Sequence, residues 1–160
     1  MKKSVLIVDS EPRSYVQLRN KLIANNYHVF YAAKIEDAMA YFDIRVADLL
    51  LLDLDVPGER IRNDLSKLAQ MNPSVRIIGV TERSQGSEIA VRERLDGVAE
   101  KPFAVGNLIA FVHELLKDPS PCSEFRYLAP RMPALHVSES HRPHRVLDCP
   151  PAYSGWGINE

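Results

Sequence analysis

The chain has 160 residues, 46% of them hydrophobic and 26% charged, which is the balance of a globular protein with a single core. Its formal net charge is -1, so no overall basic charge points to nucleic-acid binding. Asp9 interrupts the short apolar run near the N-terminus, and no stretch is long enough for a membrane span. These features predict a cytoplasmic protein that does not contact membranes.

The composition changes along the chain and divides it into two parts. Residues 1–117 show regular hydrophobic patterning, whereas residues 118–160 hold seven of the eleven prolines, both cysteines and three of the five histidines. A Pro-rich segment without lasting periodicity cannot bury enough apolar surface to form a core. We therefore predict a folded domain over 1–117 and a flexible tail over 118–160 that folding does not require.

The first part of the domain alternates strand and helix patterns. Residues 4–9 form an apolar run that predicts a buried strand, and Pro12 suits the first turn of the helix that follows. Asn25 and Asn26 end this helix, since Asn tolerates the left-handed backbone conformation. A second strand is predicted over 27–32. A second helix is predicted from apolar residues at helical spacing, namely Ile35, Ala38, Met39 and Phe42.

The most hydrophobic stretch of the chain is 49–52, which is followed directly by Asp53 and bounded by Pro57 and Gly58. An unbroken apolar run of this length is typical of a strand that is buried on both faces of a parallel sheet. A carboxylate at the tip of such a strand costs desolvation free energy unless it is paired. Because ligands of open α/β sheets gather at the carboxyl ends of the strands, Asp53 is the first candidate functional residue.

The remaining elements continue the alternation. Strands are predicted over 75–81 and 97–101, and helices over 60–71, 86–95 and 105–116. The chain thus contains five strand–helix units in succession. This (βα)5 pattern predicts an α/β fold with a doubly wound parallel sheet.

Polar residues follow several of the predicted strands, and their oxygen atoms suggest a metal site. Neighbouring carboxylates disfavour each other's ionisation unless a cation lies between them, and oxygen ligands are those that Mg²⁺ prefers. The candidate metal ligands are Asp9, Asp53 and Asp55, with Ser10 and Glu11 as further candidates. For Glu11 and Asp55 a solvated loop acid is the default interpretation, whereas Ser10 is equally explained as the N-cap of the following helix.

Asp53 also suits nucleophilic chemistry on a phosphoryl group. Thr81 and Lys101 follow the next two strands, so they are expected at the same edge of the sheet. The lysine would neutralise phosphoryl oxygens, and the threonine hydroxyl would donate a hydrogen bond to one of them.

Four segments give the chain a resemblance to a known family. Residues 5–12, 48–58, 77–81 and 100–103 resemble the motifs of the receiver domain of bacterial two-component response regulators. The resemblance covers residues 1–117 and implies a flavodoxin-like fold with strand order 2-1-3-4-5. It also implies that Asp53 accepts a phosphoryl group from a histidine kinase or phosphotransfer protein, that Thr81 and Lys101 contact the phosphate, and that the Lys101–Pro102 bond is cis.

Three positions depart from the family pattern. Ser10 stands where receivers usually carry a second acid that touches the metal. Val98 occupies the usual place of an aromatic switch residue, and Glu82 follows Thr81 where a small residue is usual. These departures predict a weakened Mg²⁺ site and a modest conformational change on phosphorylation.

Two functions remain open. The first is a stand-alone receiver that signals by phosphorylation-dependent binding of a downstream protein, without binding nucleic acid itself. The second is a pseudo-receiver, in which the same fold is a phosphorylation-independent interaction module, as the three departures favour. The resemblance also allows a homodimer through the fourth helix, fifth strand and fifth helix.

A separate enzymatic activity is not expected. Residues 53–55 resemble the Asp-x-Asp motif of haloacid-dehalogenase-type phosphatases, but the acidic pair that such enzymes carry after the lysine is missing here. The predicted chemistry is therefore limited to assisting the Mg²⁺-dependent phosphorylation and dephosphorylation of the chain itself.

Overall fold

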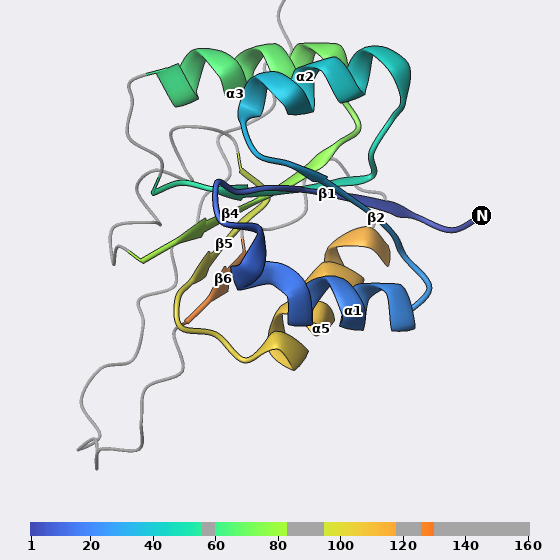
Figure 1. Ribbon diagram of the computed structural model, residues 1–160, viewed down its shortest axis with the longest axis vertical. Coiled ribbons are helices and arrows are strands. Elements are labelled where there is room, and N and C mark those ends of the chain that lie inside the picture. The colour runs from blue at the N-terminus through green and yellow to red at the C-terminus, as the bar shows by residue number, and fades with distance from the viewer. Residues whose placement is uncertain (56–59, 83–94, 118–125, 130–160) are drawn as a thin grey trace, which may run out of the picture.

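A parallel sheet with helices on both faces forms the centre of the protein (Figure 1). The computed structural model describes residues 1–55, 60–82, 95–117 and 126–129. Within these residues the sheet has the strand order β2-β1-β3-β4-β5-β6. Its strands are β1 (Ser4–Val8), β2 (His28–Ala32), β3 (Leu49–Asp53), β4 (Arg76–Thr81), β5 (Gly97–Glu100) and β6 (Arg126–Leu128). The doubly wound α/β prediction is confirmed.

The helices form two layers, one on each side of the sheet (Figure 1). They are the short 3-10 helix η1 (Pro12–Tyr15) and the α-helices α1 (Val16–Ala24), α2 (Ile35–Ile44), α3 (Arg60–Met71) and α5 (Val105–Lys117). The predicted helix over 86–95 lies outside the described residues except for its last position. In the described part of the chain, no helix is long and apolar enough to cross a membrane.

Both faces of the sheet are buried, which explains the unbroken apolar run of β3. Leu49 and Leu51 pack into the core on the side of α1 and α5, and Leu50 and Leu52 into the core on the side of α2 and α3. Fully burying a leucine side chain contributes roughly 1.5–3 kcal/mol to stability. The strand that ends on Asp53 is therefore held firmly from both sides.

The start and end of the first helix follow from its sequence. Pro12 begins η1, where its missing amide proton is tolerated, and η1 continues directly into α1. Asn26 has a φ of 70°, the left-handed conformation predicted for the end of this helix. The Tyr27 amide then donates to the Leu22 carbonyl at 3.1 Å, which closes the helix before β2.

A sixth strand lies in the segment that was predicted to be flexible. β6 pairs in parallel with β5, with Tyr127 opposite Val98, and Leu128 packs against the core on the α1 and α5 side. Residues 126–128 are thus a strand of the sheet and not a flexible segment, whereas the prediction that folding does not require them stays a prediction. Three residues are too few to show a periodic pattern, and contacts with β5 determine this strand. The rest of the predicted tail, 118–125 and 130–160, lies outside the described residues.

Candidate functional site

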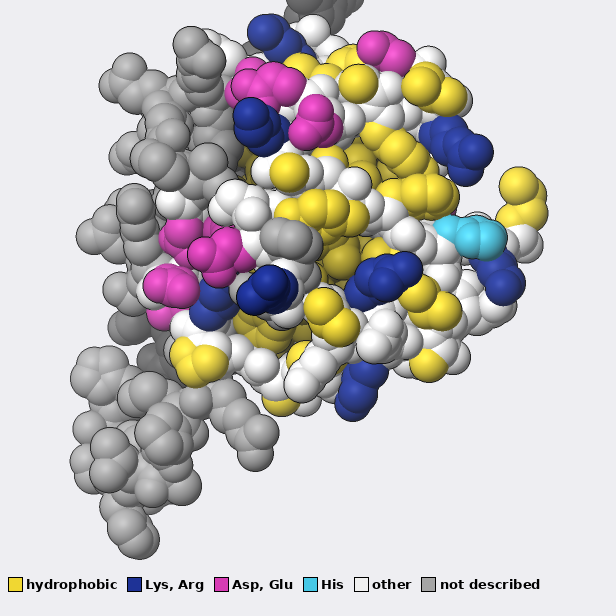
Figure 2. Space-filling model, viewed as in Figure 1, with side chains coloured by type: hydrophobic (Ala, Val, Ile, Leu, Met, Phe, Trp, Pro, Cys, Tyr) yellow, Lys and Arg dark blue, Asp and Glu magenta, His cyan; other side chains and the backbone are white. Residues whose placement is uncertain are grey.

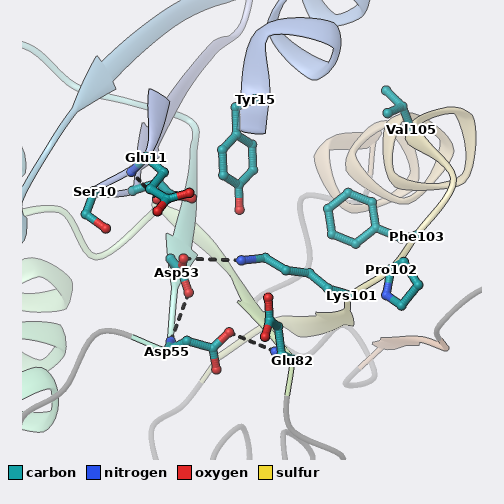
Figure 3. Close-up of a pocket in the computed structure, with 11 residues that line it drawn as sticks. Ser10, Glu11, Tyr15, Asp53, Asp55, Glu82, Lys101, Pro102, Phe103 and Val105 are labelled. Carbon is teal, nitrogen blue, oxygen red and sulfur yellow. Dashed lines mark hydrogen bonds and ion pairs between the residues drawn. The ribbon is translucent and has the colours of Figure 1, made fainter. Parts of the chain in front are cut away.

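The carboxyl ends of four neighbouring strands meet at one edge of the sheet and carry the candidate residues. Asp9 follows β1, Asp53 ends β3, Thr81 ends β4 and Lys101 follows β5. In the space-filling view, acidic side chains gather at this edge of the molecule beside basic ones (Figure 2). Asp9, Asp53 and Lys101 help to line a pocket of about 700 Å³ there (Figure 3).

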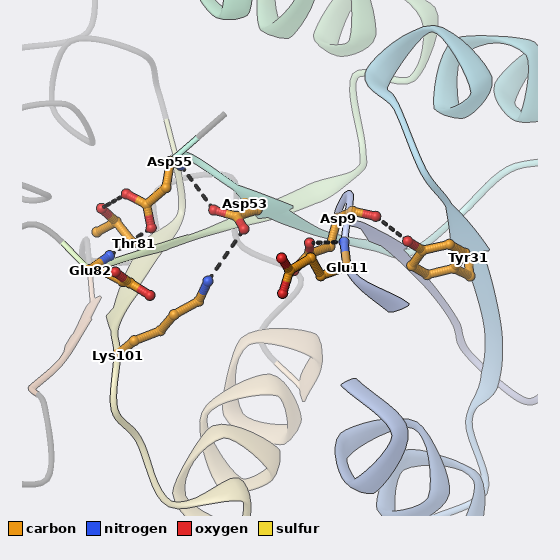
Figure 4. A network of polar contacts seen from close by, with 8 residues as sticks. All are labelled: Asp9, Glu11, Tyr31, Asp53, Asp55, Thr81, Glu82 and Lys101. Atoms are coloured by element: carbon orange, nitrogen blue, oxygen red, sulfur yellow. Dashed lines mark hydrogen bonds and ion pairs between the residues drawn. The ribbon is translucent and has the colours of Figure 1, made fainter. Parts of the chain in front are cut away.

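Asp53 lies at the centre of this pocket and is only 8% exposed. Its Oδ1 accepts a hydrogen bond from the Asp55 amide at 2.9 Å. Its Oδ2 lies 3.3 Å from the Lys101 ammonium, which reaches across from β5 (Figure 4). A buried carboxylate is tolerated when it is paired and hydrogen-bonded in this way, and the two partners fix the direction of both oxygens.

Asp9 is even more buried, with 3% of its surface exposed. Burial raises the pKa of Asp9, and the charge of Asp53 raises it further, while the Glu11 amide and the Lys101 charge act in the opposite direction. The Glu11 amide donates to Asp9 Oδ1 at 2.6 Å. A divalent cation would relieve the cost of ionising Asp9 next to a second buried carboxylate.

Tyr15 is a pocket residue that sequence reasoning missed. Its ring is 4% exposed and belongs to the core, while its hydroxyl points into the pocket (Figure 3). Burial and the charges of Asp9 and Asp53 raise the pKa of Tyr15, so it stays a neutral donor, and its interaction with Asp9 lowers the pKa of that carboxyl. The sequence signal for it is a hydroxyl on an otherwise apolar helix face.

The Asp55 side chain links the end of β3 to the end of β4 by hydrogen bonds. Its Oδ1 accepts a hydrogen bond from the Thr81 hydroxyl at 2.8 Å, and its Oδ2 accepts one from the Glu82 amide at 2.8 Å. Thr81 is fully buried, whereas Asp55 is half-buried and reaches solvent. The hydroxyl predicted to meet a phosphoryl oxygen is thus bonded to a carboxylate in this structure.

The predicted three-carboxylate metal site does not come together. In the described ranges, no group of three or more His, Cys, Asp or Glu side chains is arranged to hold a metal ion. Asp55 does not join Asp9 and Asp53, because its side chain is turned toward Thr81 at the end of β4 (Figure 4). Asp9 and Asp53 nevertheless fit Mg²⁺, because this ion is commonly bound through one or two carboxylates and keeps several of its waters.

The two further metal candidates lie at the rim of the pocket. Ser10 and Glu11 both line the pocket and are both exposed. Glu11 already takes part in the site through its backbone amide, which donates to Asp9. Their roles as metal ligands remain predictions.

Residues 5–113 match the response regulator receiver domain. The chain belongs to this family. Transcriptional regulatory protein ResD of Bacillus subtilis is 32% identical over 152 residues, which cover 89% of this chain and 61% of ResD. Sensory transduction protein RegX3 of Mycobacterium tuberculosis is 32% identical over 116 residues, which cover 71% of this chain and 51% of RegX3. The chain therefore spans less than two thirds of the length of these relatives.

Solved receiver structures share the fold. A CheY-like receiver domain protein from Methanospirillum hungatei superimposes with a TM-score of 0.67 at 23% identity, covering 74% of this chain and 97% of that one. A response regulator from Thermotoga maritima superimposes with a TM-score of 0.68 at 18% identity, covering 74% and 100%. The flavodoxin-like fold and the strand order 2-1-3-4-5 are thus confirmed, with β6 added beside β5. The Lys101–Pro102 peptide is cis, as the resemblance implied.

Several properties are general to receiver domains. Receiver domains are phosphoacceptors of two-component signalling and are in general not enzymes in their own right. They interact with histidine kinases or phosphotransfer proteins, and they generally bind Mg²⁺ at an acidic pocket. In this chain, Asp9 and Asp53 line a pocket at the carboxyl ends of the strands.

Proposed function

We propose that this receiver accepts a phosphoryl group on Asp53 from a histidine kinase or phosphotransfer protein, and that it signals by phosphorylation-dependent binding of a downstream protein. The observation that carries the proposal is the environment of Asp53. This carboxylate ends a strand that is buried at every position, opens into a pocket and faces the Lys101 ammonium at 3.3 Å. A nucleophile and a cation that can neutralise the transferred group are thus next to each other.

The proposed transfer forms one bond and breaks one. An oxygen of the Asp53 carboxylate bonds to phosphorus while the P–N bond of the donor's phosphohistidine breaks, and the bonding electrons stay on the imidazole nitrogen. Lys101 neutralises charge on the transferred group, and the Thr81 hydroxyl and Glu82 amide offer it hydrogen bonds. Asp9 and Asp53 would hold Mg²⁺, which when bound neutralises the phosphoryl oxygens.

A pseudo-receiver is the second candidate, and one observation favours it. The Thr81 hydroxyl is already bonded to the Asp55 carboxylate without any phosphate. Ser10 also favours the pseudo-receiver, because a serine in place of an acid offers a metal ion one negative charge fewer. In this alternative the same surface binds its partner constitutively.

The proposed function also concerns where the protein acts and what it binds. We propose that this receiver signals in the cytoplasm through a protein rather than nucleic acid, because residues 1–117 carry 16 Lys and Arg against 16 Asp and Glu and so have no excess of positive charge. A homodimer through the fourth helix, β5 and α5 would have to accommodate β6, because β6 pairs along β5.

Phosphorylation with a small donor tests the proposal. With acetyl phosphate and Mg²⁺, the full chain should gain one acid-labile phosphoryl group, measured by intact mass. Asp53→Asn should stay unlabelled, whereas Asp43→Asn, a change at an exposed acid on α2, should label like the wild type. Absence of labelling in the wild type, even with histidine kinases as donors, would leave the pseudo-receiver as the function.

A further inference from the structure

Among the described residues, four donors lie at the ends of β3, β4 and β5, and each is already bonded to a carboxylate oxygen. The Asp55 amide and the Lys101 ammonium face Asp53 itself, at 2.9 and 3.3 Å. The Thr81 hydroxyl and the Glu82 amide face the Asp55 side chain, both at 2.8 Å (Figure 4). The two donors at the end of β4 are thus occupied by an acid other than the proposed phosphoacceptor.

A phosphoryl group on Asp53 would need these two donors. It brings three oxygens and up to two negative charges into a largely buried position, and each oxygen has to be hydrogen-bonded or neutralised. The Lys101 ammonium can neutralise one phosphoryl oxygen. Further hydrogen-bond donors are found at the end of β4, the strand that pairs with β3. Since the Asp55 carboxylate is itself anionic, it can share neither the donors nor the space without electrostatic repulsion.

We propose that the Asp55 side chain competes with the phosphoryl group on Asp53 for the Thr81 hydroxyl and the Glu82 amide. Asp55 is then a positioning residue with two effects. In the unphosphorylated chain, the Asp55 carboxylate accepts the hydrogen bond of the Thr81 hydroxyl. During phosphorylation, the Asp55 side chain has to move away from this hydroxyl. This inference rests on the proposed function, because it concerns the regulation of the same site.

The placement of Asp55 makes such an exchange feasible. The Asp55 amide donates a hydrogen bond to Asp53, which fixes the backbone of Asp55. The Asp55 side chain therefore branches from the chain next to the reacting carboxylate. The side chain is half-buried, so it can turn into solvent and be rehydrated when it is displaced. Losing two hydrogen bonds from a charged group nevertheless slows the step in which the phosphoryl oxygens replace it.

Removing the charge at position 55 tests the competition. With acetyl phosphate and Mg²⁺, the Asp53–phosphorus bond forms as the donor's P–O bond breaks and acetate leaves. Asp55→Asn in the full chain should label Asp53 about tenfold faster than the wild type, because the phosphoryl group no longer displaces a carboxylate from Thr81 and Glu82. Asp55→Ala should also label faster, which keeps the test independent of how the new amide is oriented.

The matched control is Asp43→Asn, which makes the same carboxylate-to-amide change at an exposed acid of α2 that does not line the pocket. Its rate should stay within about twofold of the wild type, as expected for an exposed charge. A phosphate-free readout is the NMR shift of the Glu82 amide proton, which should move upfield in Asp55→Ala because its carboxylate acceptor is lost. Equal rates for Asp55→Asn and Asp43→Asn would overturn the competition and leave the proposed function standing. No labelling of any variant would overturn both.

Discussion

The Tyr127 hydroxyl on β6 donates a hydrogen bond to the Glu100 carboxylate at the end of β5. Glu100 is 8% exposed and directly precedes Lys101, whose ammonium faces Asp53. Strand β6, which lies beyond α5, thus contacts the strand that positions the lysine of the candidate site. Burial and the neighbouring carboxylate raise the pKa of Tyr127 to about 12, so at neutral pH its hydroxyl keeps the proton that it donates.

Removing this hydroxyl should destabilise the protein. Tyr127→Phe keeps the ring but leaves the buried Glu100 carboxylate without its β6 donor, and we expect a loss of about 1 kcal/mol in the free energy of unfolding. Urea denaturation measures it. In a Glu100→Gln background the same tyrosine change should cost less, because the partner is no longer charged. Equal costs in both backgrounds would mean that the two side chains do not interact.

The same contact predicts a loss of stability in alkaline solution. The ordinary tyrosine pKa of 10.0 is raised in the folded state, so folding favours the protonated hydroxyl. Its contribution should be complete below pH 10 and disappear as the pH rises toward 12. The difference in stability between the wild type and Tyr127→Phe should therefore shrink over this range, which thermal denaturation at a series of pH values can follow. A constant difference would contradict the raised pKa.

The buried Asp9 carboxylate should lower the free energy of unfolding when no metal is bound. Because burial raises the pKa of Asp9, folding favours its protonated form, and stability falls as the pH rises from 3.8 through the raised value. Asp9→Asn removes the charge at neutral pH and should stabilise the protein on the order of 1 kcal/mol in EDTA. Added Mg²⁺ should raise the melting temperature of the wild type more than that of the variant. A variant that is less stable in EDTA would contradict this account.

The parts of the fold that sequence predicted are those with strong local patterns. The apolar run before Asp53 and the helical spacing in α2 and α5 are visible within ten to fifteen residues, so their type and order were predictable. The strand-end positions of Thr81 and Lys101 followed from the same reasoning, since parallel strands present their ends at one edge.

The features that sequence did not predict depend on tertiary contacts. β6 has three residues, and its position is determined by pairing with β5 and by the contact of Tyr127 with Glu100. The side-chain direction of Asp55 depends on two donors that lie more than twenty residues later in the chain. Tyr15 fitted the apolar face of the first helix, and only the folded structure places its hydroxyl in the pocket.

Gly79 shows how tightly the sheet is packed beneath the site. A Cβ atom at this position of β4 would lie 2.5 Å from Leu54 Cδ1 and 2.9 Å from Leu95 Cδ1. Gly79→Val should therefore lower the free energy of unfolding by about 1–3 kcal/mol through overpacking. Gly106→Val is a useful comparison, because a Cβ there meets no atom within 4 Å. If the two variants are equally stable, the packing at Gly79 is looser than the structure shows.

Ser10 should determine how strongly the receiver binds Mg²⁺. This serine is exposed at the rim of the pocket, beside the buried Asp9, in a position where the family usually has a second acid. Among the described residues that line the pocket, Asp9 and Asp53 are the buried acids, while both oxygens of Asp55 accept hydrogen bonds from the end of β4. Mg²⁺ can complete its shell with water, but it loses the attraction of one negative charge.

Ser10→Asp should therefore tighten Mg²⁺ binding by about tenfold, measured by calorimetric titration of the full chain. Ser10→Asn is the matched control, because it introduces a side chain of similar size without the charge and should bind Mg²⁺ like the wild type. If Asp55 does not serve the metal, Asp55→Ala should leave the affinity unchanged, whereas a clear loss would show that its carboxylate turns to the ion when Mg²⁺ is present. An unchanged affinity in Ser10→Asp would mean that position 10 lies too far from the cation for its charge to matter.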